Sequence, residues 1–270
     1  MPLIDAEITG EINRIKASNV LPDPPLSPRE PSLCSSLPDK QRLYAIQRFV
    51  ESFEYNYTGK PFLVMKKSRG ASHVNTCAKQ IIRAALPIQC VEAVFLASYL
   101  SSTMYDIDRV PLSFKSKFKD GVHRHIVLAV RLNGKWGSLG ISRRANLMNK
   151  PIKFDTLFQL VKEFERSYEE VYHRLLTVYI GLPMPQDKIF SDRPIKWRAT
   201  KIRIYRNDPA DVEQMITHFT DNMKLLNDYY ILNGSLPDTG VKSNQATNRR
   251  RNSNFKSAIY SSDGDSSGLE

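Results

Sequence analysis

A cysteine, a histidine and a serine in the middle of the chain could together carry out nucleophilic catalysis. Cys90 stands at the head of an apolar run, His125 begins a β-branched segment, and Ser142 ends the segment after it. A thiol attacks carbonyl carbons when a nearby imidazole takes its proton and a third group orients that imidazole. The three residues therefore predict a nucleophile, a base and an orienter, provided that the fold brings them together.

The histidine and the serine lie on the two strands of a predicted β-hairpin. Asn133-Gly134 joins two apolar runs, and this dipeptide favours a type I′ turn, whose two central residues need positive φ. The register that follows from a two-residue turn places His125 opposite Ser142, with both side chains on one face. A bulge at Gly137 or Gly140 would shift the register and turn the two side chains to opposite faces.

The cysteine lies in the first turn of a predicted buried helix. Pro87 cannot stand inside a helix, and from Val91 the apolar residues recur at helical spacing to about Ser102. The positive end of a helix and a neighbouring imidazole both lower a thiol pKa. We therefore expect Cys90 to form a reactive thiolate.

Each of the three residues also has an ordinary structural interpretation. A single cysteine at the edge of an apolar helix is often a small core residue. A histidine at the start of a strand is often structural, and a serine after a glycine-rich strand is often a turn residue. His123 lies two residues before His125 and would share its strand face, so it competes for the role of base. Spacing alone leaves these alternatives open.

Hydrophobic periodicity predicts an α+β fold around these residues, in which the nucleophile helix packs on an antiparallel sheet. Apolar residues recur at helical spacing in four further segments, and short β-branched runs predict strands. The expected helices span 41–54, 72–85, 155–175 and 209–230; beyond the hairpin, the expected strands span 61–66, 177–180 and 194–206, while 111–118 could be a strand or an irregular segment.

Composition divides the chain into a central domain and two tails. A cluster of prolines favours an extended backbone in residues 1–39, where only a short helix over 5–16 is expected. The catalytic domain should span 40–232. Residues 233–270 are rich in Ser, Asn, Asp and Gly, and we expect them to be disordered.

The overall composition narrows the classes of function. The formal net charge of +11 should attract acidic partners: nucleic acid, an anionic membrane or a polyacidic protein tail. No apolar run approaches the ~18 residues of a membrane span, the first residues contain no signal-peptide core, and no Cys/His cluster has zinc spacing. Three cysteines make no even disulfide framework and favour a reducing compartment. Cys77 falls on the inward face of a predicted helix and is expected to be structural.

Several strings around the three residues resemble the vasohibins, a family of cysteine-type tubulin tyrosine carboxypeptidases with a transglutaminase-like fold. The similarity runs from about residue 41 to residue 205, and the strings keep the order and spacing of the family. They are Tyr55–Gly59, Lys66–Arg69, Ala85–Ile88, Cys90–Val94, Arg124–Leu128, Leu139–Gly140, Ser142–Arg144 and Leu147–Met148. The resemblance implies the same papain-like arrangement that the periodicity predicts.

The resemblance also implies roles for the catalytic positions. Cys90 would be the nucleophile, His125 the general base, and Ser142 the group that orients the imidazole. Tyr55 matches a phenol that helps to stabilise the oxyanion. No metal or other cofactor is expected.

The substrate-binding positions of the family are also present, with one departure. Arg143 matches an arginine that holds the terminal carboxylate of the substrate, and Lys67 and Arg69 match basic residues that contact the acidic tail before the scissile bond. The family has a lysine immediately before the cysteine, which helps to hold the carboxylate. This chain has Gln89 there, which can donate a hydrogen bond but carries no charge.

On this resemblance, the chain would remove the C-terminal tyrosine from the acidic tail of α-tubulin, in the cytoplasm and on microtubules. Neither membrane nor nucleic acid would be a partner. The family docks a small helical partner protein on a longer N-terminal helical region, which the short segment here matches poorly. Two other readings remain: an acyltransferase or amidase on the same scaffold, and an inactive basic module that binds microtubules or RNA, which the charge fits equally well.

Overall fold

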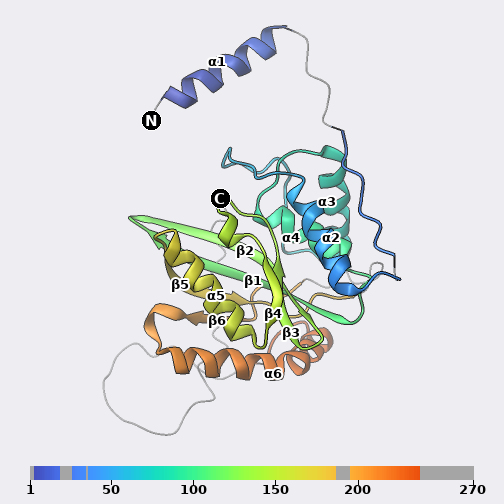
Figure 1. The fold of residues 1–270 in the computed structure, drawn as a ribbon, viewed down its shortest axis with the longest axis vertical. Coiled ribbons are helices and arrows are strands. Elements are labelled where there is room, and N and C mark those ends of the chain that lie inside the picture. Colours follow the sequence, from blue (N-terminus) through green and yellow to red (C-terminus); the bar gives the residue numbers. More distant parts are fainter. Residues whose placement is uncertain (1–2, 19–25, 35, 187–194, 238–270) are drawn as a thin grey trace.

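A six-stranded antiparallel sheet forms the centre of the molecule, with strand order β4-β3-β2-β1-β5-β6 (Figure 1). The computed structural model describes residues 3–18, 26–34, 36–186 and 195–237. The helices are α1 (Leu3–Ser18), α2 (Asp39–Glu51), α3 (Ala71–Ala84), α4 (Cys90–Leu100), α5 (Leu157–Glu170) and α6 (Pro209–Asn233), with short 3-10 turns η1 (Ala145–Leu147) and η2 (Ile204–Arg206). The strands are β1 (Ile107–Phe118), β2 (Gly121–Leu132), β3 (Lys135–Leu139), β4 (Lys150–Phe154), β5 (Arg174–Ile180) and β6 (Thr200–Arg203). The predicted α+β fold is confirmed.

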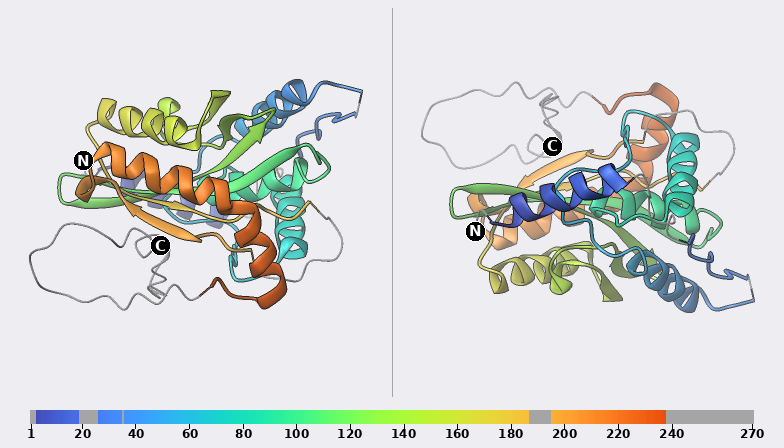
Figure 2. Two further views of the ribbon diagram at one scale, coloured as in Figure 1. Left: turned by 90° about the horizontal axis from the view of Figure 1, so that it is seen from below. Right: turned by 90° about the horizontal axis from the view of Figure 1, so that it is seen from above.

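Different helices cover the two faces of the sheet (Figures 1 and 2). Helices α2, α3 and α4 pack on one face and enclose what we call the first core. Helices α5 and α6 pack on the other face and enclose the second core. Side chains alternate across strand β2, so that Ile126 and Leu128 enter the first core while Val127 and Ala129 enter the second.

The predicted hairpin forms in the expected register. Leu132 pairs with Lys135 and Leu128 pairs with Leu139. Both residues of the Asn133-Gly134 turn have positive φ, 49° and 77°, as a type I′ turn requires. Strand β2 also pairs with β1 along its whole length, so it is a central strand of the sheet.

The pairing between β2 and β3 nevertheless ends before it reaches the two residues of interest. Strand β3 stops at Leu139, so His125 and Ser142 do not face each other in the ladder, and the expected pairing is wrong. The cause lies 93 residues away in sequence, on α2. The Gln47 side-chain amide donates to the carbonyl of Gly140 at 2.9 Å and accepts from its N–H at 3.0 Å. These bonds satisfy the backbone groups of Gly140.

Two elements on the flanks differ from expectation. Residues 61–66 form no strand. Pro61 has no N–H to donate to a ladder, and Phe62 and Val64 are 48% and 78% exposed. Helix α5 ends at Glu170 rather than near residue 175, because the chain turns at Tyr172 with a φ of 63° and then enters β5.

The remaining elements largely follow the predicted pattern. Residues 111–118 belong to strand β1. Strand β6 covers only residues 200–203 of the predicted 194–206 strand, because the 3-10 turn η2 takes up 204–206; residue 194 lies outside the described residues. The predicted disorder of the C-terminal tail concerns mostly 238–270, which also lie outside the described part of the chain. Within the described part, no helix combines the length and the apolar character needed to cross a membrane.

Candidate active site

Cys90 is the first residue of α4, and the residues around it fix the start of that helix. Gln89 has an extended backbone, and its carbonyl accepts from the N–H of Ala93 at 3.0 Å, as the residue before a helix does. Its N–H donates to the buried carboxylate of Glu92 at 3.2 Å. After this turn nearly every side chain of α4 is buried, so hydrophobic packing holds the helix and its first residue in place.

Tyr55 reaches the same place through backbone hydrogen bonds. The N–H of Asn56 donates to the carbonyl of Ile88 at 2.8 Å, and the N–H of Ile88 donates to the carbonyl of Glu54 at 3.2 Å. This short parallel bridge lays Tyr55 beside the segment that leads into Cys90. The guanidinium of Arg143 lies over the Tyr55 ring, 5.8 Å from its centroid. Burial, followed by the nearby Cys90, raises the pKa of the Tyr55 phenol.

Cys90 and His125 line one small pocket of about 40 Å³ at the point where β3 has left β2. Its walls come from β1, β2, α4, β5 and the segment before β6. The lining residues are Lys67, Cys90, Val91, Ser113, Phe114, Arg124, His125, Ile126, Tyr179 and Arg198. The fold thus brings the predicted nucleophile and the predicted base together.

The imidazole of His125 is oriented by a backbone carbonyl. Its Nε2 lies 2.8 Å from the carbonyl oxygen of Leu147 in η1. Burial lowers the pKa of His125 to about 4, and the bond to Leu147 opposes that shift only in part. The ring is therefore neutral near pH 7 and has one N–H. Because a carbonyl only accepts, that proton is on Nε2, which leaves Nδ1 free to accept another.

The expected lowering of the Cys90 pKa is not found. Cys90 is only partly exposed, and this burial raises the pKa of the thiol. Hydrogen bonding from the backbone of Ile126 and the charge of Lys67 work against the burial without overcoming it. Cys90 and His125 therefore rest as a neutral thiol and a neutral imidazole, and not as a thiolate and an imidazolium.

Ser142 makes a different hydrogen bond from the one expected. Within the described residues no hydrogen bond joins Ser142 to His125; its Oγ instead accepts from the N–H of Arg144 at 3.3 Å. This contact shapes the turn that presents Arg143 above Tyr55. The orienting contact expected from Ser142 is made by the carbonyl of Leu147.

A group of basic side chains borders the pocket. Lys67, Arg124 and Arg198 all line it. The carbonyl of Lys67 accepts from the indole N–H of Trp197 at 2.8 Å, and its ammonium lies 5.4 Å from the Trp197 ring centroid. Trp197 in turn stacks on Phe95 of α4. Burial lowers the pKa of Lys67 to about 8, so most of the lysine is still charged at neutral pH.

Two other predicted residues lie outside the pocket. Arg69 is exposed at the start of α3, where its charge acts on His73 and Cys77. His123, the competing base, is exposed on β2, and its ring centroid lies 4.8 Å from that of His173. Cys77 is buried, as expected for a structural cysteine. Among the described residues no group of three or more His, Cys, Asp or Glu side chains is arranged to hold a metal ion.

Three parts of the site could not be recognised from the sequence. The Leu147 carbonyl is a backbone group, and every residue has one, so the residue type gives no indication of its role. Arg198 follows Trp197, the residue that fixes Lys67, but its own type and neighbours in the sequence do not mark it as part of the site. Tyr179 lies under the Arg198 guanidinium, 4.5 Å from ring centroid to guanidinium carbon. The aromatic side chain of Tyr179 on β5 is the only feature of the sequence that could have indicated a partner for Arg198.

Comparison with known proteins agrees with the geometry. A family model described as Vasohibin matches residues 4–224. The chain is 37% identical over 212 residues to "Tubulinyl-Tyr carboxypeptidase 1" of Mus musculus, a match that covers 78% of this chain and 56% of that protein. The chain therefore spans little more than half the length of the curated relative it matches.

Proposed function

Because the chain belongs to the vasohibin family, we propose that it is a cysteine carboxypeptidase that removes the C-terminal tyrosine from α-tubulin. The main support is that Cys90 and His125 line the same pocket. The neutral His125 ring binds Leu147 through Nε2, so its Nδ1 can accept a proton. The name of the mouse relative gives the substrate class. The proposal also implies a cytoplasmic, microtubule-associated protein that needs no cofactor and binds neither membrane nor nucleic acid.

In the first half of the reaction, the Cys90 sulfur attacks the carbonyl carbon of the last peptide bond. Its proton passes to Nδ1 of His125, which becomes an imidazolium stabilised by the Leu147 carbonyl. The oxyanion forms beside the Tyr55 hydroxyl and the N–H of Cys90 at the tip of α4. Donors of this kind contribute about 2.7–4 kcal/mol each to transition-state stabilisation. Because the resting pair is neutral, proton transfer accompanies the attack.

In the second half, the carbon–nitrogen bond breaks and His125 returns its proton to the amine of the leaving tyrosine. The shortened tubulin chain remains as a thioester on Cys90. Nδ1 then takes a proton from water, whose oxygen attacks the thioester carbonyl. The sulfur leaves with the proton from His125, and the pair returns to its neutral state.

Cleavage at the chain end follows from recognition of the free carboxylate. Arg143 is exposed, lies over Tyr55 and can pair with a terminal carboxylate in the strong, directional way of arginine. An internal peptide bond offers no such partner. Gln89, where the family has lysine, can add a hydrogen bond without charge, so Arg143 carries more of the carboxylate recognition in this chain.

Acidic side chains before the scissile bond would meet the basic border of the pocket. Lys67 and Arg198 both line it, and the exposed Arg69 lies two residues after Lys67. The formal charge of +11 would speed the encounter with a polyacidic tail. We thus assign Lys67 and Arg69 to the acidic tail and add Arg198 to them.

The proposal includes a small helical partner chain, which would bind to α1. Figure 1 shows α1 standing apart from the rest of the molecule, and Ile12 and Ile15 on it are 45% and 36% exposed. A partner helix could cover this apolar side. Size-exclusion chromatography of the full chain with a family partner protein, and of an Ile12→Asp variant, would show whether α1 makes that contact.

Mass spectrometry of a tubulin-tail peptide tests the function directly. The wild-type protein should release one tyrosine from the free-acid peptide and very little from the amidated peptide, whereas Cys90→Ala should release none. Equal cleavage of the two peptides would overturn carboxylate recognition, and full activity of Cys90→Ala would overturn the mechanism. A product in which an amine is joined to the peptide would reveal an acyltransferase. Binding of microtubules or RNA without turnover, and without alkylation of Cys90, would reveal an inactive module.

A further inference from the structure

The acceptor that orients His125 belongs to a short turn, which itself must be held in place. Leu147 lies in η1, between the end of β3 and the start of β4. Its side chain is buried in the second core, and its N–H donates to the carbonyl of Arg144 at 2.9 Å. A single 3-10 turn has little stability of its own. Contacts from outside the turn must therefore determine where the Leu147 carbonyl points.

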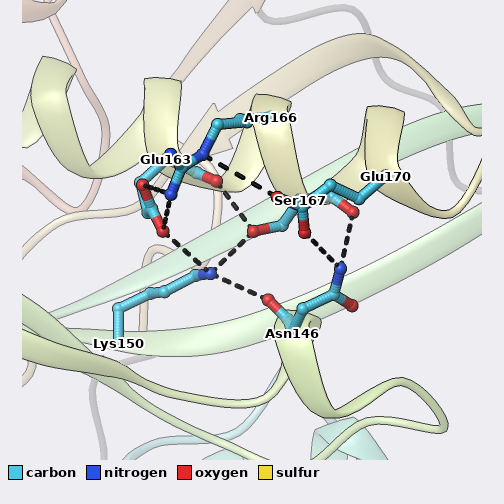
Figure 3. A network of polar contacts seen from close by, with 6 residues as sticks. All are labelled: Asn146, Lys150, Glu163, Arg166, Ser167 and Glu170. Atoms are coloured by element: carbon cyan, nitrogen blue, oxygen red, sulfur yellow. Dashed lines mark hydrogen bonds and ion pairs between the residues drawn. The ribbon is translucent and has the colours of Figure 1, made fainter.

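Lys150 supplies the central contact of this kind (Figure 3). Its side chain is 8% exposed. The ammonium donates to the carbonyl of Asn146 at 2.8 Å, to Oγ of Ser167 at 2.7 Å and to a carboxylate oxygen of Glu163 at 3.5 Å. An ammonium has three donors, and all three are used. The lysine thus ties the residue before Leu147 to two residues of α5.

Asn146 adds a second connection between the turn and the same helix. Its side-chain amide donates to the carbonyl of Ser167 at 3.1 Å and to the carboxylate of Glu170 at 2.9 Å. Glu163, the acidic partner of Lys150, is also held by Arg166 at 2.7 Å. Figure 3 shows these groups joined into one network between η1 and α5.

We propose that Lys150 is a positioning residue for catalysis: by fixing the Asn146 peptide group against α5, it holds the neighbouring Leu147 carbonyl where it orients His125. The carbonyls of Asn146 and Leu147 are consecutive, one bound by Lys150 and the other by His125. Without the bond from Lys150, the peptide group between Asn146 and Leu147 can rotate. The Leu147 carbonyl then changes direction and no longer orients His125. This assignment rests on the proposed function in naming His125 as the base.

The network uses properties that only lysine offers. Its compact ammonium points three donors in tetrahedral directions, which matches the carbonyl, hydroxyl and carboxylate around it. Arginine presents a planar fork and needs more room, so it should restore the charge but not the geometry. Methionine keeps the apolar stem and removes every donor. The two substitutions therefore separate charge from position.

The first test compares Lys150→Met with Lys162→Met. Lys162 also lies on the α5 side and pairs with Glu165, but its side chain is exposed and is no part of the network around η1. Because small displacements of a catalytic group cost up to about 100-fold in rate, Lys150→Met should lower kcat about 10–100-fold with KM changed less than about twofold. Lys150→Arg should recover part of kcat, and Lys162→Met should match the wild type.

Two readouts make the result independent of tubulin turnover. In ¹⁵N spectra of labelled histidine, His125 should have its proton on Nε2 in the wild type and should show a mixture of tautomers in Lys150→Met. Alkylation of Cys90 by iodoacetamide should slow in Lys150→Met and remain unchanged in Lys162→Met. If the wild type fails to cleave tubulin peptides, these two measurements still decide the role of Lys150.

Ser167→Ala covers the case in which Lys150→Met does not fold. Alanine favours a helix, and this change removes one acceptor of the ammonium while the lysine remains. We expect a loss of kcat of about 3–10-fold with the same shift in the His125 spectrum, since one of three contacts is lost. An unchanged kcat and an unchanged His125 spectrum in a folded Lys150→Met or Ser167→Ala protein would overturn the proposal.

Discussion

The two faces of the sheet position their parts of the site by different forces. On the first face, α4 is buried almost all round, and hydrophobic packing holds Cys90 at its tip. On the second face, polar contacts between α5 and η1 hold the backbone carbonyl that orients His125. Packing tolerates changes of charge and polarity outside the core, whereas a chain of buried hydrogen bonds fails when one partner is removed. The position of Cys90, the proposed nucleophile, should therefore change little on single polar substitutions, whereas the orientation of His125, the proposed base, should be sensitive to them.

The largest effect is expected in the pH dependence of stability, which tests whether the second face encloses His125. The folded pKa of about 4 lies below the ordinary value of 6.5. As the pH falls through 6.5, the unfolded chain takes up a proton that folded His125 refuses until about pH 4. The free energy of unfolding should therefore fall over this interval, by up to about 3 kcal/mol from this residue.

Urea unfolding of wild type and His125→Gln at about pH 7 and about pH 4.5 measures that contribution. The variant should lose less stability on acidification, and Cys90→Ala should behave like the wild type. Parallel loss in His125→Gln and the wild type would show that the imidazole titrates freely and is not enclosed by the second face.

The next largest effect is expected at Arg143, which lies over the Tyr55 ring and which we propose to bind the substrate carboxylate. Arg143→Ala should lower kcat/KM for a free-acid tail peptide about 30-fold, because a hydrogen-bonded pair with a charged group contributes about 2 kcal/mol. The amidated peptide should remain as poor as before. Arg144→Ala is the matched control, because its N–H still donates to Ser142. A uniform loss for both peptides would assign Arg143 to the fold and not to the carboxylate.

The smallest effect is expected at Ser142, whose hydroxyl binds the Arg144 N–H and not the imidazole. Ser142→Ala should lower kcat only about 2–5-fold, since it loses one exposed hydrogen bond worth about 1 kcal/mol or less. Steady-state kinetics on the tail peptide measure this. A loss of about 100-fold or more, the size expected when a general base is lost, would mean that Ser142 orients His125 during turnover. The proposed contrast between the two faces would then be wrong.

The sequence predicted the parts of the site that depend on local chemistry. The Asn133-Gly134 turn set the register of β2 against β3, and Pro87 set the start of α4 just before Cys90. Helical spacing identified α2, α3, α5 and α6 to within a few residues, except at the end of α5. In each of these elements the pattern of apolar residues or a single turn residue determines the structure, so a short stretch of sequence is sufficient.

The parts that could not be predicted depend on contacts between distant residues. Strand β3 ends early because Gln47 on α2 binds Gly140. Nothing in the type of either residue predicts that the two will pair. The pKa of Cys90 rises because burial outweighs the helix terminus, and burial is a property of the whole fold. The orienter of His125 is a peptide carbonyl, which every residue carries. The residues 61–66 had the composition of a strand but no neighbour with which to pair.

Because the Gly140 N–H donates to Gln47 on α2, the hydrogen exchange of this one amide reports on how firmly α2 is packed on the first face. Gln47 gives Gly140 the donor and the acceptor that an adjoining strand would otherwise offer, so this proton exchanges with solvent only when α2 lifts away. Gly140 leads directly into Ser142 and Arg143, so the same opening loosens the segment that carries Arg143, the residue that we propose to bind the substrate carboxylate. The rate of deuterium uptake at the Gly140 amide would thus report how often this region opens in the absence of any peptide.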